Sequence, residues 1–315
     1  MTTTPEQSSP TARQVVAGLD LHGRTCAITG ATSGLGRASA LALAGAGARV
    51  LLLGRSTTGL VDTAEQIRSE VADAEVHPVH LDLADLTSVR AAAQEVAALT
   101  DRLDVLMNNA GVMFTPLDRT ADGFERQLGV NHVGHFALTT ALLPTLLTAE
   151  RPRVVTLSSG GHVLGDVDLG DPHWEHRPYD KFVAYGASKT ANVLFTVGLR
   201  ERYADAGLTA FAVHPGTVAT ELGRHMSRDD FSELGRLVRE RRAGDPTKSP
   251  WLEFVNPEQG AATQVWAATR APDTSEAVYL ADCAPSDDVA AYAVDPGRAR
   301  LLWAASESWC AAALS

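Results

Sequence analysis

The sequence predicts a single α/β domain whose doubly wound, mostly parallel sheet has seven strands and helices on both faces. Two observations predict this fold. Short apolar segments alternate with longer helical ones along the chain, and a glycine-rich turn follows the first apolar segment. We expect a flexible tail over residues 1–14 and one domain over 15–315, in which segments 160–183 and 219–256 interrupt the alternation.

Strands are expected where short apolar or β-branched runs stand together, and helices where longer runs have helical composition between them. The expected strands are residues 26–29, 50–53, 76–81, 105–108, 154–158, 209–214 and 278–281. The expected helices are residues 35–44, 63–71, 86–99, 123–147, 187–206 and 257–268.

The first expected strand leads directly into the glycine-rich turn. Gly30, Gly34 and Gly36 have the spacing Gly-x-x-x-Gly-x-Gly, and a helical stretch begins at Leu35. A strand, a glycine turn and a helix N-terminus bring unpaired backbone N–H groups together, where a pyrophosphate can bind. An ordinary glycine-rich connection is the alternative, and the motif favours a Rossmann-type dinucleotide site.

The end of the second expected strand indicates which dinucleotide binds. Sites that prefer NAD place an acid there for the ribose 2′-hydroxyl, whereas an arginine accommodates a 2′-phosphate. Here Arg55 stands at that point, and no acid occurs before Asp62. Ser56 and Thr57 can add hydroxyl contacts. We therefore expect NADP(H) as cofactor, the alternative being that Arg55 is a solvated loop residue.

Two further strand ends carry polar or small residues. Residues 105–108 lead into Asn109, Ala110 and Gly111, where an amide can brace strand ends and small residues let a flat ring approach. Residues 153–157 lead into Ser158 and Ser159. Ligands of open α/β sheets bind at the carboxyl edge of the strands, so we expect both segments to lie there.

Tyr185 and Lys189 are four residues apart in a helical stretch and share one helix face. A free tyrosine, with a pKa of about 10, is a poor base at neutral pH. We expect the lysine ammonium to lower the tyrosine pKa, so that the phenol can give and take a proton. Alone, the pair could be a solvated helix face.

Taken together, these four segments resemble the short-chain dehydrogenase/reductase family over roughly residues 14–310. The chain looks most similar to the retinol dehydrogenases and to the catalytic part of the WW-domain-containing oxidoreductase. The resemblance implies four catalytic residues, and none of these positions is substituted: Asn131, Ser159, Tyr185 and Lys189. It also implies these cofactor-binding residues: Gly30, Thr32, Ser33, Gly34, Leu35, Gly36, Arg55, Asp82, Leu83, Asn109, Ala110, Gly111, Tyr185, Lys189, Pro215, Gly216, Val218 and Thr220.

The resemblance also assigns roles. Tyr185 would exchange the proton of the substrate oxygen, and Ser159 would hydrogen-bond that oxygen. Lys189 would hold the nicotinamide ribose, and Asn131 would position a water linking Lys189 to solvent. Val218 and Thr220 would contact the carboxamide. Ser33 stands where some NADP-dependent relatives carry a second basic residue, which leaves Arg55 as the only cationic determinant.

Composition excludes several classes of protein. A net charge of −11 argues against nucleic acid as a partner, and no apolar run approaches a membrane span. The polar start lacks the apolar core of a signal peptide, and three widely spaced cysteines suggest reduced thiols. We expect a cytoplasmic protein with a small-molecule substrate. The histidine spacing fits no recognised metal pattern, so we expect no metal site.

The substrate is less well defined. We expect 160–183 and 219–256 to cover it, and His162 and Trp174 to line its pocket. The arginine-rich run after Thr220 fits either an anionic substrate or a solvated lid helix with an apolar side. Resemblance favours a lipophilic or polycyclic alcohol, aldehyde or ketone, although a soluble bacterial metabolite is an equal alternative.

Two alternative functions fit the same motifs. The bound cofactor could serve a reaction without net redox change, such as epimerisation or elimination, or the chain could bind NADP(H) as a sensor without turnover. The stretches 123–147 and 187–206 carry the family's usual dimer surface by resemblance, so a homodimer is expected unless the enlarged segment before Tyr185 blocks it.

Overall fold

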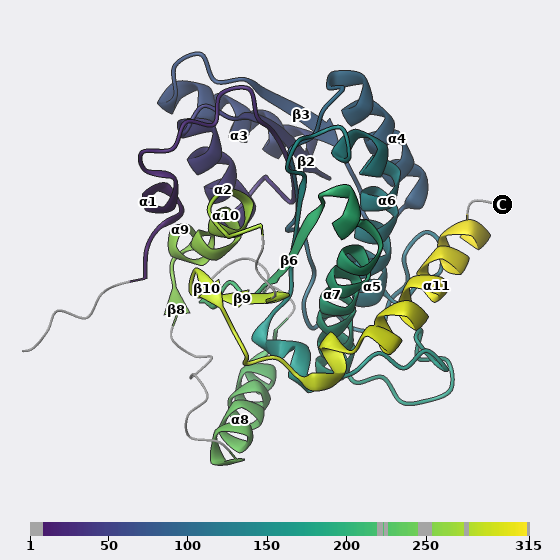
Figure 1. Ribbon diagram of the computed structural model, residues 1–315. Coiled ribbons are helices and arrows are strands. Elements are labelled where there is room, and N and C mark those ends of the chain that lie inside the picture. The colour runs from purple at the N-terminus through teal and green to yellow at the C-terminus, as the bar shows by residue number, and fades with distance from the viewer. Residues whose placement is uncertain (1–8, 219–222, 224–225, 245–253, 274–276, 314–315) are drawn as a thin grey trace, which may run out of the picture.

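The computed structural model describes residues 9–218, 223, 226–244, 254–273 and 277–313 (Figure 1). The main sheet has eight strands in the order β10-β9-β6-β5-β4-β1-β2-β3. Its strands, in chain order, are β1 (Thr25–Thr29), β2 (Arg49–Gly54), β3 (Val76–His80), β4 (Val105–Asn108), β5 (Arg153–Leu157), β6 (Thr209–Val213), β9 (Tyr279–Ala281) and β10 (Ala284–Pro285). A separate pair joins β7 (Thr217–Val218) to β8 (Phe254–Val255).

All seven expected strands are present and pair in parallel, which confirms the predicted doubly wound α/β fold. The eighth strand, β10, pairs antiparallel with β9 at the sheet edge. The turn between them places Asp282 and Cys283 at positive φ, which non-glycine residues rarely adopt. A two-residue strand that contains a proline gives no periodic signal, so the sequence did not predict it.

Helices cover both faces of the sheet (Figure 1). Those on one face are α1 (Ala12–Val16), α2 (Gly34–Gly45), α3 (Thr57–Glu70) and α10 (Ala262–Thr269); those on the other are α4 (Leu86–Leu99), α6 (Gly134–Leu146), α7 (Lys181–Tyr203) and α11 (Pro296–Ala313). In β1, Cys26 and Ile28 face the first layer and Ala27 faces the second. A sheet buried on both faces explains why its strands are continuous apolar runs.

Several helix bounds differ from those expected. The stretch 123–147 contains α5 (Arg126–Leu128), a π-helical turn η1 (Gly129–Val133) and α6. Helix α7 begins at Lys181, six residues before the expected start at 187, because Asp180 caps its N-terminus by accepting from the N–H groups of Phe182 and Val183. The shorter elements are η2 (Gly160–Leu164), η3 (Ala204–Ala206), α9 (Pro257–Gly260) and η5 (Ala291–Val294).

Helices at both ends of the chain were not predicted. Helix α1 starts at Ala12 with a capping box from Thr11 and Gln14, inside the segment expected to be a tail. Helix α11 packs along α7, where Trp303 contacts the rings of Phe136 and Phe195. It covers part of the surface that resemblance gives to a dimer, and the homodimer stays a prediction.

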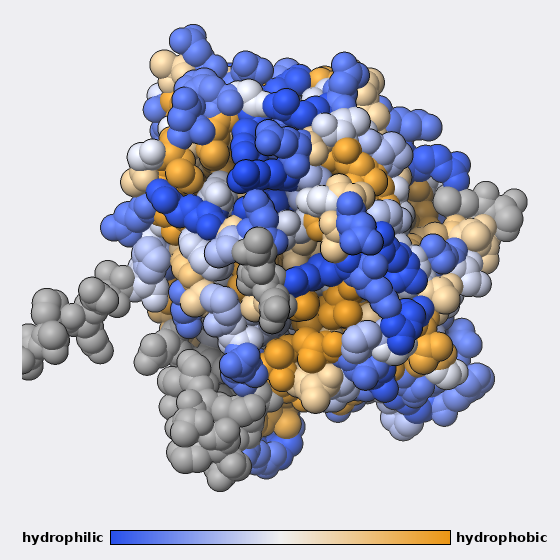
Figure 2. All heavy atoms as spheres, viewed as in Figure 1, coloured by the Kyte–Doolittle hydropathy of each residue, from blue (hydrophilic) through white to orange (hydrophobic). Residues whose placement is uncertain are grey.

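Helix α8 (Arg228–Gly244) lies apart from the two main layers, at the lower end of the view (Figure 1). It belongs to the second segment expected to interrupt the alternation. The space-filling view shows that hydrophilic residues cover most of the face that is turned to the viewer, and that hydrophobic residues gather near its middle (Figure 2). Within the described residues, no helix combines the length and apolar character that crossing a bilayer requires.

Candidate active site

The glycine turn between β1 and α2 has no room for a side chain at Gly30 or at Gly36. Gly30 has a φ of +69°, and a Cβ there would lie 2.9 Å from the Cα of Ala110. A Cβ at Gly36 would collide with the carbonyl oxygen of Gly30 and would lie 2.6 Å from Nδ2 of Asn109. Gly34, with a φ of +52°, begins α2, and Ser33 at the N-cap makes no side-chain cap hydrogen bond. The first N–H groups of α2 therefore remain for an anion.

The loop after β4 is braced against the end of β1, as the sequence predicted. Asn109 donates from Nδ2 to the carbonyl oxygen of Thr29 at 2.7 Å. The backbone N–H groups of Asn109 and Ala110 both donate to Thr29 Oγ1 at 2.9 Å. Gln264 on α10 donates to Oδ1 of Asn109 at 3.2 Å. The role of Gln264 was missed, although a glutamine in a largely apolar helical stretch was the available signal.

The end of β2 lies next to the glycine turn. A Cβ at Gly54 would be 3.4 Å from Cγ2 of Thr32, which places the two segments in contact distance. Arg55 follows on the surface and has no hydrogen bond or ion pair with any residue that the structure describes. Ser56 accepts from the N–H of Gly59 and caps α3, so its hydroxyl already has a structural role. A cation without a partner in the described part of the chain thus stands beside the turn.

The remaining cofactor candidates lie at other strand ends. Asp82 Oδ1 accepts from the N–H of Ala84, and Leu83 packs against Gly134, where a Cβ would lie 3.0 Å from Leu83 Cβ. Pro215 and Gly216, the latter with a φ of +79°, precede Val218 in β7. Thr220 lies outside the described residues.

Tyr185 and Ser159 meet where β5 ends beside α7. Ser159 lowers the pKa of the Tyr185 hydroxyl, which places the two side chains next to each other, and the tyrosine is only 4% exposed. Ser159 Oγ also accepts from the N–H of Gly161 at 3.0 Å. A Cβ at Gly161 would lie 2.9 Å from Cε1 of Tyr185, so only glycine lets the ring reach Ser159 without displacement. This requirement for glycine was not predicted from the sequence.

Lys189 lies one helical turn after Tyr185 and is buried with it. Its Nζ lies 5.8 Å from the centre of the Tyr185 ring and donates to the carbonyl oxygen of Leu157 at 3.1 Å. Burial lowers the pKa of Lys189 to about 8 and raises that of Tyr185 to about 12, while the Ser159 hydrogen bond lowers the latter by less. The expected lowering of the Tyr185 pKa by Lys189 is therefore not found, because desolvation raises this pKa, and Tyr185 is a neutral phenol at neutral pH.

Asn131 braces the site from the π-helical turn η1. Its Oδ1 accepts from the N–H of Val112 at 2.8 Å, and its Nδ2 donates to Val112 O and Ser188 Oγ, each at 2.9 Å. A Cβ at Gly111 would lie 3.1 Å from Asn131 Oδ1 and 3.6 Å from Lys189 Nζ. The structure therefore brings Asn131, Gly111 and Lys189 together, with the asparagine side chain engaged in bracing.

The two expected substrate residues lie elsewhere. His162 is fully buried, with Nδ1 at 2.7 Å from Ser159 O and Nε2 accepting from the N–H of Ala290 at 3.0 Å. Trp174 packs inside its own segment, against Tyr179 and under the guanidinium of Arg177. The positions of both side chains differ from the sequence expectation. Each side chain joins neighbouring segments of the chain and does not face Tyr185.

An apolar cluster surrounds Tyr185 in their place. Phe114 and Phe182 are its buried members, and α8 contributes partly buried leucines. Besides Tyr185, the described hydrophobic residues of this cluster are Met113, Phe114, Leu164, Phe182, Met226, Leu234 and Leu237. Phe114 and Met113 were missed, although the apolar run directly after Gly111 was a visible signal.

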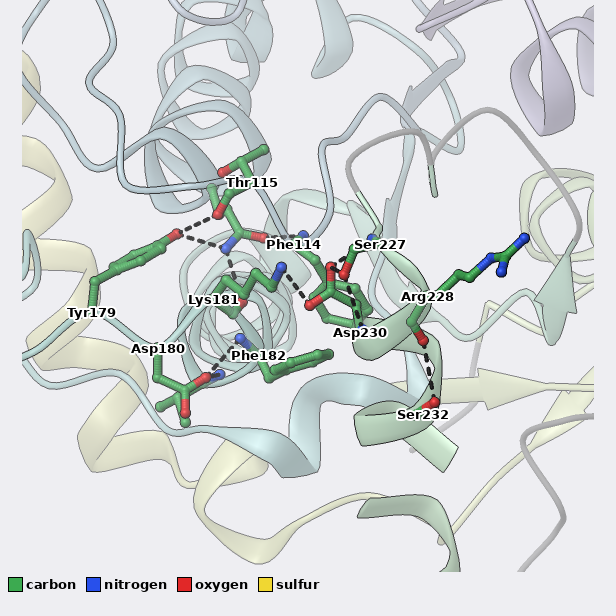
Figure 3. A network of polar contacts seen from close by, with 12 residues as sticks. Phe114, Thr115, Tyr179, Asp180, Lys181, Phe182, Ser227, Arg228, Asp230 and Ser232 are labelled. Atoms are coloured by element: carbon green, nitrogen blue, oxygen red, sulfur yellow. Dashed lines mark hydrogen bonds and ion pairs between the residues drawn. The ribbon is translucent and has the colours of Figure 1, made fainter. Parts of the chain in front are cut away.

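Helix α8 is fixed to α7 beside this cluster. Asp230 and Ser227 form reciprocal hydrogen bonds at the start of α8, and Asp230 forms a 2.5 Å ion pair with Lys181 at the start of α7 (Figure 3). A helix is therefore present in the second interrupting segment, and its Leu234 and Leu237 pack against the cluster, while its role as a lid stays a prediction. Among the described residues, no group of His, Cys, Asp and Glu side chains could hold a metal ion.

Comparisons with known proteins agree with this geometry. The sequence model described as short chain dehydrogenase matches residues 24–230. Human retinol dehydrogenase 13 is 39% identical over 294 residues, which cover 91% of this chain and 84% of the relative.

Solved structures share the fold. A protein from Mycobacterium Paratuberculosis aligns with a TM-score of 0.71 and 35% identity, covering 96% of this chain and 98% of that one. A chain from Beutenbergia cavernae, solved with NADP bound at low occupancy, aligns with a TM-score of 0.65 and 29% identity, covering 84% of this chain and 96% of that one. The chain belongs to the short-chain dehydrogenase/reductase family of oxidoreductases and is similar to its retinol dehydrogenases.

Proposed function

We propose that this protein is an NADP(H)-dependent oxidoreductase that transfers a hydride between the nicotinamide and the carbonyl or alcohol carbon of a lipophilic small molecule. The observation that carries the proposal is that the buried Tyr185 and Ser159 lie side by side against Gly161, with Lys189 on the next helical turn. These groups can supply a proton and stabilise a developing oxyanion at one point.

The preference for NADP(H) is supported by the end of β2. The glycine turn fits a pyrophosphate, because backbone atoms occupy the places where a Cβ at Gly30 or Gly36 would lie. Arg55 stands beside it as a cation without a partner among the described residues, and β2 ends in glycine, not in an acid. The Beutenbergia cavernae structure, which holds NADP, supports the same choice.

The roles of the catalytic residues follow from their protonation and contacts. In reduction, Tyr185 as a neutral phenol donates its proton to the substrate oxygen, and Ser159 donates a hydrogen bond to that oxygen. In oxidation, the proton returns to Tyr185. Lys189 would hold the ribose hydroxyls, and Asn131 fixes the loop beside it. When bound, the nicotinamide supplies or accepts the hydride.

A lipophilic substrate is supported by the surroundings of Tyr185. Every side chain that packs around its ring in the cluster is aromatic, aliphatic or a thioether. Apolar surroundings of this kind favour apolar ligands and exclude water from the reacting atoms.

The first test is NADPH oxidation, followed by absorbance with NADH in parallel, against a panel of aldehydes and ketones. We expect turnover with NADPH that is lost in Tyr185→Phe, which removes the proton donor and keeps the ring packed. Failure of the protein to bind either cofactor would refute the proposal. NADPH binding without reduction of any carbonyl would instead favour a non-redox reaction or a sensor.

A further inference from the structure

Phe114 has a backbone conformation that phenylalanine rarely adopts. It follows Gly111 in the loop after β4, and its φ of +52° lies in the left-handed region that favours glycine. The residue is 2% exposed, so its ring is packed on all sides. Strained residues of this kind persist only where their surroundings fix them, and they cluster at functional sites.

The Phe114 ring lies directly beside the proton donor. Its centre is 4.9 Å from that of Tyr185, with the planes 70° apart in an edge-to-face contact. It is also 4.6 Å from the Phe182 ring at 53°. Both contacts have favourable aromatic geometry. The space next to the Tyr185 ring is therefore bounded by Phe114.

Gln127 on α5 holds the strained backbone in place. Its Oε1 accepts from the N–H of Phe114 at 2.8 Å, and the side chain is fully buried. Its Nε2 donates to the Tyr179 hydroxyl at 2.9 Å and to the carbonyl oxygen of Lys181 at 3.0 Å. One amide thus links the loop of Phe114 to the start of α7, which carries Phe182.

Tyr179 and Glu125 complete this network. Figure 3 shows the Tyr179 hydroxyl pointing toward Thr115. The Tyr179 hydroxyl lies 2.9 Å from Glu125 Oε1, to which it donates, and 3.2 Å from the Thr115 carbonyl oxygen. Glu125 also accepts from the N–H groups of Gln127 and Leu128. Because nearly every polar atom of the network has a partner, the Phe114 loop is held rigidly.

The other walls of the cluster can adapt more easily. Met113, Met226, Leu164, Leu234 and Leu237 are unbranched or aliphatic side chains that are only partly buried, and methionine in particular fills gaps of varied shape. Phe114 is a rigid ring on a fixed backbone. Phe182 is also a rigid ring of the cluster, but Phe114 is the one whose ring contacts that of Tyr185, so it is the member that can set a size limit.

We propose that Phe114 is a specificity-determining residue that limits the size of the substituent beside the reacting carbon, and that Gln127 is the positioning residue that keeps it there. The proposal rests on the proposed function and deepens it. It predicts that the wild type discriminates against carbonyl compounds whose second substituent is branched or bulky.

The test is a series of ketones with one constant apolar group and a second group that grows from methyl to tert-butyl. We expect Phe114→Ala to raise the ratio of kcat/KM for the bulkiest against the smallest member by about tenfold to a hundredfold. Phe211→Leu is the matched control, since Phe211 is fully buried in the core on the other layer of the sheet. It should lower stability and leave the ratio unchanged.

The variant Gln127→Met tests whether Gln127 positions Phe114 or only stabilises the fold. It keeps the size of the side chain and removes the acceptor for the Phe114 N–H, so the ratio should move in the same direction as in Phe114→Ala. Adding Gln127→Met to Phe114→Ala should then change the ratio no further. A loss of stability with an unchanged ratio would reduce Gln127 to a structural residue and overturn its part of the proposal.

Binding of the same ketones to the protein loaded with NADP⁺, measured by calorimetry, distinguishes the two proposals. Turnover with an unchanged ratio in Phe114→Ala would overturn the selectivity proposal and leave the function standing. If the wild type reduces no ketone or aldehyde, the function fails. In that case a shift in relative ketone affinities in Phe114→Ala would still support the size limit, and unchanged affinities would overturn it.

Discussion

The cofactor side and the substrate side of this site are built in different ways. On the cofactor side, glycines bring backbone to within contact of backbone, and Asn109 and Thr29 join two neighbouring strands. On the substrate side, aromatic and aliphatic side chains from four separate segments meet around Tyr185, and an ion pair fixes α8 over them. The first arrangement tolerates little change, whereas the second can vary one side chain at a time. Substrate choice can therefore change while cofactor binding is kept.

The largest effect should come from adding one methyl group on the cofactor side. Gly36→Ala places a Cβ against the Gly30 carbonyl oxygen and 2.6 Å from Asn109 Nδ2, so the turn must move. We expect NADPH binding, measured by fluorescence titration, to weaken by about a hundredfold or more. Gly45→Ala, in the same helix with no atom within 4 Å of the new Cβ, is the control and should bind normally. Equal binding by both variants would show that the turn does not hold the cofactor.

The second largest effect should be the dependence of kcat/KM for reduction on pH. Burial lowers the pKa of Lys189 to about 8, so its ammonium is present below that pH and is lost above it, while Tyr185 keeps its proton to about 12. We expect kcat/KM for reduction to fall above a pH of about 8 by up to tenfold per unit. In Lys189→Arg the side chain keeps its positive charge, so the fall in kcat/KM at high pH should disappear, whatever the absolute rate of the variant. A wild-type profile that is flat to beyond about pH 9 would contradict this assignment.

Cofactor choice should depend on Arg55. Removing a cation from the 2′-phosphate in Arg55→Ala should lower the preference for NADPH over NADH by about tenfold to a hundredfold in kcat/KM. Arg90→Ala, an exposed arginine on α4, controls for the change in net charge. If the two variants retain the same preference, another group determines cofactor choice.

On the substrate side, the strain at Phe114 predicts a reversal of the usual order of glycine and alanine. Because φ is +52°, Phe114→Gly should be more stable than Phe114→Ala by roughly 1 kcal/mol in chemical denaturation. At Phe211, in the middle of strand β6, glycine should instead be the less stable replacement. The same order at both positions would show that Phe114 relaxes out of the left-handed conformation.

The same contrast explains how much could be predicted from the sequence. The strands, the glycine turn and the bracing by Asn109 follow from local patterns, because backbone geometry restricts the residues allowed there. The cluster around Tyr185 depends on segments far apart in the chain, so Phe114, Gln127 and Gly161 were missed. His162 and Trp174 were expected at the pocket from their nearness in sequence, yet their partners come from distant segments or from their own loop.

The pKa of Tyr185 was also expected wrongly, for a physical reason. Sequence shows that Lys189 shares a helix face with Tyr185, but it does not show how deeply both are buried. Desolvation of the phenolate raises the Tyr185 pKa, and the ammonium of Lys189 is itself desolvated and donates to the carbonyl oxygen of Leu157. Burial depends on how the whole chain packs, which no local motif contains.

The smallest effect should come from the ion pair that fixes α8. Lys181 and Asp230 are 28% and 11% exposed, and water weakens such pairs, so Asp230→Asn should cost at most about 1 kcal/mol of folding stability. Lys181 lowers the pKa of Asp230 below its unfolded value, so this contribution is present above that value and lost as pH falls through the folded pKa. We expect Asp230→Asn to raise KM and leave kcat nearly unchanged, because in the proposed function α8 covers the substrate and does not touch the reacting atoms. The charge swap Lys181→Asp with Asp230→Lys should restore KM in part. An effect on cofactor affinity instead of KM would show that α8 belongs to the cofactor side, and the contrast between the two sides would fail.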